Sequence, residues 1–92
     1  GALTQMEQNL PLSEDGAILY VLRIGRYNNP KDSLHDLFDI YVVDGDQKTS
    51  SIALHSDICH LVRNGVLREN SVICVRAYKL VFDELYIGGN GY

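Results

Sequence analysis

The sequence is short of basic residues. It has 8 Lys and Arg against 12 Asp and Glu, which gives a formal net charge of −4 when the His side chains are neutral. Proteins that bind nucleic acid draw much of their affinity from Lys and Arg, because these side chains displace counterions from the phosphates. The acidic balance therefore argues against a general nucleic-acid surface. It favours a protein-binding role, with any contact to DNA confined to a local patch.

Long apolar runs are also missing. No run approaches the roughly 20 residues that span a bilayer, and the first residues do not show the charged and then apolar pattern of a secretory signal. We therefore expect no membrane partner. The chain has 92 residues, of which 46% are hydrophobic, and this suits one domain with one modest core. We expect that domain to cover residues 1–92, with residues 1–16 as an N-terminal segment.

Cysteine is scarce. The two cysteines, Cys59 and Cys74, lie in apolar runs on different expected elements. This placement favours two buried free thiols over a disulfide. Free thiols are typical of a reducing compartment, so we expect the cytosol or the nucleus.

The usual groupings of catalytic and metal-binding residues are absent as well. His55, Cys59 and His60 lie close in sequence, but zinc takes four ligands, often in paired short spacings, and no second pair accompanies them. Neighbouring residues on a helix point about 100° apart, so Cys59 and His60 do not form a nucleophile and base. The glycine-rich residues 88–91 lack the following helix of a phosphate-binding loop. We expect no enzyme activity, no metal and no cofactor.

What the sequence does contain is a series of runs typical of β-strands. They are separated by a polar loop at residues 28–33, by the Asp44-Gly45 pair that favours a tight hairpin, and by one segment of helical spacing. The runs, rich in β-branched and aromatic residues, are residues 18–24, 38–43, 49–54 and 72–82. This order predicts an all-β protein, namely a five-stranded Greek-key barrel of the OB-fold type with a helix between strands three and four.

Two short helices are expected beside the strands. In residues 3–10 the apolar Leu3, Met6 and Leu10 have helical spacing before Pro11, and this helix is expected to plug one mouth of the barrel.

The second helix lies between strands three and four. Ser56 is a suitable N-cap for it, Gly65 is a natural stop, and Ile58, Leu61 and Val62 form one apolar stripe. On this helix we expect Cys59 to lie in the core and His60 in solvent.

Alternation along the strands separates a core face from a ligand face. The core candidates are Phe38, Ile40, Val42, Ile52 and Leu54. The opposite face carries Arg23, Asp39, Tyr41 and Ser51. In OB folds this face of strands two and three, with its neighbouring loops, forms the binding groove. The candidate groove residues, for protein or single-stranded DNA, are Arg23, Arg26, Tyr41, Lys48 and Ser51.

Tyrosines have two interpretations. They stack on bases of single-stranded nucleic acid beside a basic groove, or they complete the core with their hydroxyl at its edge. Tyr41 beside Arg23, and Tyr27 beside Arg26, suit the first. The second is preferred for Tyr20, and for Tyr41 both remain open.

Several segments resemble the N-terminal OB domain of the large subunit of replication protein A (RPA). They are residues 18–24 (ILYVLRI), 42–45 (VVDG), 51–54 (SIAL) and 61–62 (LV). The resemblance implies a nuclear module that recruits protein partners in DNA replication and repair. In that family a basic cleft accepts acidic amphipathic segments and binds single strands weakly.

The likeness to that cleft is incomplete. Arg23 and Ser51 fall on cleft positions and keep a compatible character. The departures are Gly25 in place of an arginine, Leu37 and Asp39 in place of basic residues, and Asp83 in place of an apolar residue. The resemblance therefore implies a much weakened cleft for acidic peptides.

A second resemblance is to the first OB domain of RADX, an RPA-like single-strand-binding protein. It rests on residues 21–27 (VLRIGRY), 38–39 (FD), 44–45 (DG), 61–62 (LV) and 66–67 (VL). Both relatives imply genome maintenance and differ in their partners.

Three functions remain open from the sequence. The first is recruitment of protein partners by an RPA-like module. The second is direct, weak binding of single-stranded DNA through Arg23, Arg26, Lys31, Tyr41 and Lys48. The third is self-association through a structural barrel.

The last strand of the barrel looks incomplete. The apolar run that starts at Val72 continues to Ile87, and Asn90-Gly91 is a strong hairpin signal without a returning strand. We expect the native protein to continue past Tyr92 with a β-run that closes the barrel, because an unpaired edge would favour association.

Overall fold

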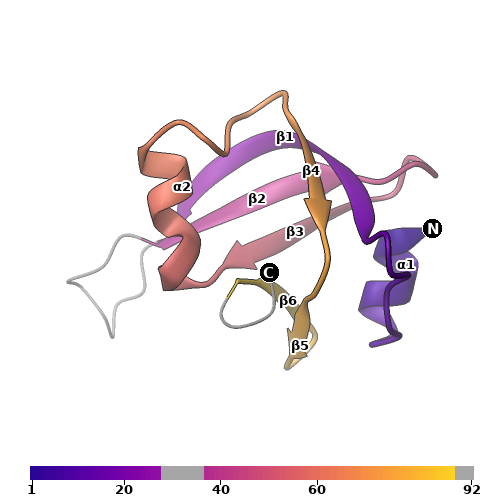
Figure 1. The fold of residues 1–92 in the computed structure, drawn as a ribbon. Coiled ribbons are helices and arrows are strands. Elements are labelled where there is room, and N and C mark those ends of the chain that lie inside the picture. Colours follow the sequence, from indigo (N-terminus) through magenta and orange to yellow (C-terminus); the bar gives the residue numbers. More distant parts are fainter. Residues whose placement is uncertain (28–36, 89–92) are drawn as a thin grey trace.

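The protein forms one curled, six-stranded sheet with little helix, seen in a computed structural model that describes residues 1–27 and 37–88 (Figure 1). The strands are β1 (Ala17–Tyr27), β2 (Leu37–Val43), β3 (Thr49–Leu54), β4 (Val72–Val75), β5 (Lys79–Val81) and β6 (Glu84–Ile87). The helices are α1 (Ala2–Glu7), the short 3-10 helix η1 (Ser56–Ile58) and α2 (Cys59–Arg63). The all-β prediction is confirmed at this level. The expected loop at 28–33, with Lys31, and the Asn90-Gly91 turn lie outside the described residues.

The strand order is β4-β1-β2-β3-β6-β5. Every neighbouring pair is antiparallel except β3 and β6, which run parallel. Strands β4 and β5 follow each other in sequence yet lie at opposite ends of this order. The sheet therefore curls into a half-barrel, with α1 and α2 at opposite ends of its long strands (Figure 1).

The core faces of β2 and β3 agree with the alternation in the sequence. Ile40, Val42 and Ile52 have no exposed surface and Leu54 is also buried, whereas Phe38 is only half-buried. The remaining buried apolar residues are Leu3, Met6, Ala17, Leu19, Val21, Ile58, Cys59, Leu67, Val75, Leu85 and Ile87.

Strand β1 does not follow simple alternation. Its pairing with β2 shifts between Val21 and Arg23, so Leu22 is an extra residue, a β-bulge. Val21 is buried before the bulge, while Arg23 after it is exposed and Ile24 packs against the core. Simple alternation would place Val21 and Arg23 on the same face, and the bulge places them on different faces.

Helix α1 is shorter than the spacing predicted. Leu3 and Met6 are buried as expected, but the helix ends at Glu7 and Leu10 is 45% exposed. The Leu3 N–H donates to Asp44 Oδ2 (3.1 Å). This bond fixes the helix against the β2–β3 turn.

The second helical segment has a different cap from the expected one. His55, and not Ser56, is the N-cap, since its Nδ1 accepts from the Asp57 N–H (3.3 Å). The segment ends as expected, with Gly65 in the left-handed region at φ 74°. Cys59 is buried and His60 exposed, both as predicted.

Cys74 contradicts the prediction of two buried thiols. Both cysteines are free, but Cys74 is exposed on β4. It pairs with Ile18 on β1, which is 59% exposed.

The prediction of one continuous strand over residues 72–82 is also wrong. The chain forms β4, continues to β5, and then turns at Phe82 and Asp83, with φ of 50° and 63°. Positive φ at both central positions is typical of a tight hairpin turn that usually contains Asn or Gly. The chain returns from this turn as β6, which pairs with both β5 and β3. Within residues 1–27 and 37–88, no helix has the length and apolar character to cross a membrane.

Candidate interaction groove

The outward face of β1, β2 and β3 carries a polar row. Arg23 pairs with Tyr41 across β1 and β2, and Tyr41 pairs with Ser51 across β2 and β3. These three residues border a pocket of about 320 Å³, which we call the arginine pocket, lined by Arg23, Ile24, Gly25, Asp39, Tyr41 and Ser51.

Tyr41 is held from two sides. The Arg23 guanidinium carbon lies 5.1 Å from the centre of the Tyr41 ring, within the range of a cation–π contact. The Tyr41 hydroxyl donates to Thr49 Oγ1 (2.9 Å). The ring and the guanidinium are therefore placed before any ligand binds, which lowers the entropic cost of binding.

Gly25 and Asp39 shape the floor of the arginine pocket. They are partners across β1 and β2, and a Cβ built on Gly25 would lie 2.4 Å from Asp39 Oδ1. A larger residue at position 25 would collide with that carboxylate. Gly25 therefore lets the Asp39 side chain lie against β1. The arginine pocket thus contains one cation, Arg23, and one anion, Asp39.

A second pocket adjoins the first at Ser51, which lines both. It has a volume of about 430 Å³, and we call it the acidic pocket; its lining residues are Glu7, Ser50, Ser51, Leu80, Asp83, Glu84 and Leu85. Glu7 is partly neutralised, because its Oε2 lies 2.8 Å from Lys48 Nζ. Because Ser51 lines both pockets, we treat them together as one groove, with Arg23 lining the arginine pocket and Asp83 and Glu84 lining the acidic pocket.

The structure brings together only some of the predicted groove residues. Arg23, Tyr41 and Ser51 share the arginine pocket. Arg26 lies further along β1, opposite Phe38, and is exposed. Lys48 pairs with Glu7 and does not line either pocket, so its place in the groove stays a prediction.

Sequence reasoning missed the acidic side of the groove. Asp83 was noted only as a departure from a family pattern, while Glu7 and Glu84 carried no signal. They come from α1 and β6, which the fold alone brings together. Phe82, beside Asp83, is 98% exposed, and nothing in its apolar neighbourhood in sequence indicated this.

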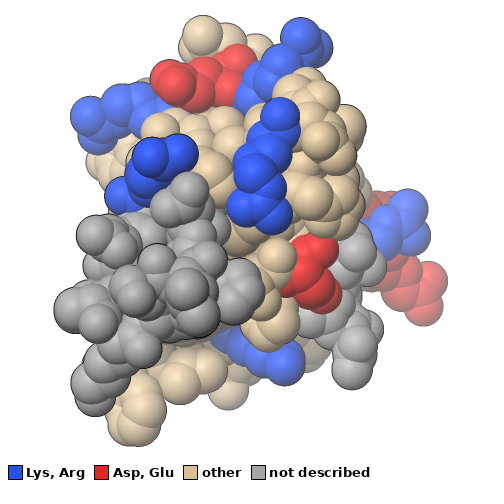
Figure 2. All heavy atoms as spheres, turned by 90° about the vertical axis from the view of Figure 1, so that its left-hand side faces the viewer, with Lys and Arg blue, Asp and Glu red and all other residues tan. Residues whose placement is uncertain are grey.

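Basic side chains gather at the end of the molecule that carries α2. Figure 2 shows Lys and Arg over the upper half of this end, with few acidic side chains between them. The exposed basic residues of β1, α2 and the connection after α2 are Arg23, Arg26, Arg63 and Arg68. The connection is tied to β1, since the Asn70 N–H donates to the Val21 carbonyl (2.7 Å).

The residues that suggested catalysis or metal binding have structural partners. His55 caps η1 and its Nδ1 lies 2.9 Å from Asp57 Oδ1, and the buried Cys59 Sγ donates to the His55 carbonyl (3.6 Å). Among the residues the structure describes, no three His, Cys, Asp or Glu side chains gather so that they could hold a metal ion. The groove is therefore characterised by its shape, by the positive charge of Arg23 and by the negative charges of Asp83 and Glu84.

Comparisons with protein-family models, with curated proteins and with solved structures find no match to this chain.

Proposed function

We propose that this chain is a non-enzymatic OB-fold interaction module of an RPA-like single-stranded-DNA-binding protein. In this role it recruits protein partners in DNA replication and repair in the nucleus. The proposal combines the two resemblances in the sequence with the topology of the sheet and the charges of the groove.

The topology supports the OB assignment. An OB fold is a partly open, five-stranded Greek-key barrel. Strands β1, β2 and β3 form a meander, helix α2 follows β3, and β6 returns parallel to β3. Strands β4 and β5 are separated only by residues 76–78. We take them as two halves of the fourth strand, with β6 as the fifth.

The charge pattern of the groove is the observation that favours a protein partner. A nucleic-acid strand carries only negative charge, and next to Asp83 and Glu84 it would be repelled. A peptide with acidic residues at one end and basic residues at the other matches both pockets. Such complementarity contributes mainly specificity and association rate.

Direct binding of single-stranded DNA is the second candidate function. The stacked Arg23 and Tyr41 favour it, because bases stack on aromatic rings beside cations. The gathering of Lys and Arg in Figure 2 extends the same charge beyond the groove.

A charge-reversal experiment tests the proposal. The probe is a fluorescein-labelled amphipathic peptide with Asp and Glu in one half and Lys in the other. Arg23→Glu combined with Arg26→Glu should weaken its binding about tenfold, because Arg23 lines the arginine pocket and Arg26 adds positive charge further along the same strand. The thermal midpoint should stay within about 2 °C, since both residues are exposed.

The matched control is Arg76→Glu combined with Lys79→Glu. It changes the net charge equally but lies outside both pockets of the groove, so it should leave peptide affinity unchanged. Equal losses in both double variants, or no loss in the first, would contradict the proposed groove. Tighter binding of an oligothymidylate than of the peptide would support the second candidate instead.

A further inference from the structure

The hairpin of β5 and β6 (Figure 1) ends in a two-residue turn that presents an aromatic ring to solvent. Phe82, the first residue of the turn, is 98% exposed, whereas the next most exposed large apolar side chain of the described residues, Val66, is 69% exposed. Aromatic side chains bury more area than others when a partner covers them, and they dominate the energetics of interfaces. Phe82 is therefore the apolar side chain that a partner would gain most by covering.

The backbone of this turn is strained for the residues that it carries. Phe82 and Asp83 have φ of 50° and 63°, a region that bulky residues rarely adopt and that Asn or Gly adopts readily. Phe82 therefore costs stability, and the fold does not bury its ring in return. Strain of this kind gathers at binding and active sites, which points to a role for the ring outside the fold.

Two carboxylates follow the ring directly. Asp83 and Glu84 are exposed and line the acidic pocket. The Tyr86 hydroxyl donates to Glu84 Oε2 (3.0 Å), which holds that carboxylate in place. Within residues 1–27 and 37–88, no basic side chain forms a salt bridge with Asp83 or Glu84. The turn thus combines an uncovered aromatic ring with negative charge that can attract a cation.

Arginine is the side chain that matches this combination best. Its planar guanidinium stacks on aromatic faces and also presents a fork of donors that fits a carboxylate. A lysine ammonium is a strongly hydrated point charge, so it gains from the carboxylates and less from the ring. The same protein contains one such contact already, because the Arg23 guanidinium carbon lies 5.1 Å from the centre of the Tyr41 ring.

We propose that Phe82 is a specificity-determining residue, which makes the groove select arginine over lysine in the basic half of a partner segment. The partner's guanidinium lies against the Phe82 ring and forms a salt bridge with the neighbouring Asp83 carboxylate. This role rests on the proposed function, because it requires the basic half of the partner to bind at the acidic pocket. It adds to the groove a side chain that lines neither pocket.

Two fluorescein-labelled amphipathic peptides are the probes. They share the same half of Asp and Glu, and their basic half carries Arg in one peptide and Lys in the other. Fluorescence anisotropy with the wild-type chain should show about fivefold tighter binding of the Arg peptide, because stacking on the exposed ring adds to the charge pairing that both peptides share.

Three variants of Phe82 test the ring. Phe82→Asn suits the backbone of the turn, so it should fold, leave the affinity for the Lys peptide unchanged and remove the preference for the Arg peptide. Phe82→Leu keeps an apolar side chain without a ring and should also remove the preference. Phe82→Tyr keeps the ring and should retain the preference.

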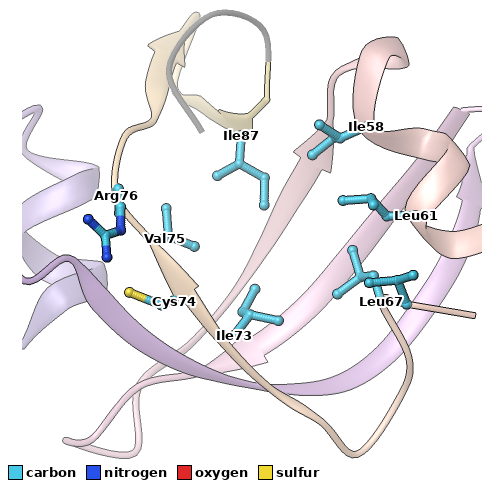
Figure 3. A pocket seen from close by; sticks show the side chains of 9 residues that line it. Ile58, Leu61, Leu67, Ile73, Cys74, Val75, Arg76 and Ile87 are labelled. Atoms are coloured by element: carbon cyan, nitrogen blue, oxygen red, sulfur yellow. The ribbon is translucent and has the colours of Figure 1, made fainter.

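Val66→Asn is the matched control, since it also replaces an exposed apolar side chain by Asn. Val66 lies outside both pockets of the groove and lines a separate apolar pocket of about 280 Å³ between α2 and β4 (Figure 3). This variant should bind both peptides as the wild type does.

Equal affinity of the two peptides for the wild-type chain would overturn the role of Phe82. A preference for the Arg peptide that persists in Phe82→Asn or in Phe82→Leu would overturn it too, because the ring would then not be what selects arginine.

The double variant Arg23→Glu with Arg26→Glu separates this role from the proposed function. If it weakens the Lys peptide but the wild type shows no preference for arginine, only the role of Phe82 is wrong. If it affects neither peptide while the preference depends on Phe82, the turn binds arginine and the proposed groove is wrong. Binding of neither peptide to the wild type at about 1 mM, the weak end of specific association, would overturn both.

Discussion

At the scale of single residues, Asp44 shows what a sequence signal leaves out. Asp44-Gly45 predicts a hairpin turn, and the turn is present between β2 and β3. The carboxylate does more: it accepts N–H groups from Leu3, Asp46 and Lys48 at 3.1, 2.9 and 3.0 Å. The bond to Leu3 joins residues 41 positions apart. No local pattern predicts that contact, because it depends on where α1 packs.

These bonds predict how stability depends on pH. Burial raises the pKa of Asp44, but the backbone N–H groups of Leu3, Lys48 and Asp46 outweigh it and hold the pKa below its ordinary value of 3.8. A carboxyl whose pKa is lowered by folding contributes stability above its unfolded pKa of about 3.9. That contribution is lost as pH falls through the lower folded pKa. Asp44→Asn should therefore lower stability at pH 7 and flatten its loss between about pH 5 and 2.

Urea unfolding at a series of pH values measures this difference. Asp15→Asn, at an exposed aspartate, is the control and should follow the wild-type curve. Parallel curves for wild type and Asp44→Asn would show that the three N–H bonds do not favour the ionised carboxylate.

At the scale of elements, strands with strict alternation were predictable and those with local irregularities were not. Strands β2 and β3 alternate, and their buried faces match Ile40, Val42 and Ile52. For strand β1, simple alternation does not predict the two faces, because one bulge at Leu22 changes the face of every later residue relative to the earlier ones. The groove was predicted for its β1–β3 side, where alternation held after that bulge, and missed on its β6 side.

The β5–β6 turn was hidden for another reason. Phe82 and Asp83 occupy left-handed conformations that usually indicate Asn and Gly. A bulky residue at such φ is strained. Replacing the pair by Phe82→Asn and Asp83→Gly should therefore stabilise the protein by about 1 kcal/mol. Urea unfolding should show a higher midpoint with an unchanged m-value.

Phe82→Leu is the matched control for the turn. It removes the aromatic ring but keeps the strained backbone, so stability should stay within about 0.5 kcal/mol of wild type. If the Asn-Gly variant is instead less stable, then Phe82 contributes a contact that outweighs the strain of its backbone.

At the scale of the whole molecule, the distribution of charge matters more than its sum. The net charge is −4, yet Lys and Arg gather at the end of the molecule seen in Figure 2. The carboxylates of Asp83 and Glu84 lie in the other half of the groove. A single strand of DNA can therefore contact the basic end but gains nothing from crossing the groove.

The salt dependence of DNA binding measures how far such a strand extends. Each phosphate neutralised on a single strand contributes about −0.7 to the slope of log K against log salt. If only Arg23 and Arg26 engage phosphates, a titration of oligothymidylate should give a slope of about −1.4. Arg23→Glu with Arg26→Glu should bring the slope near zero, while Arg76→Glu with Lys79→Glu should leave it unchanged. A slope steeper than about −3 would require more than four phosphate contacts. The basic end would then have to bind DNA on its own, and recruitment of protein partners would no longer be the function that the charge pattern favours.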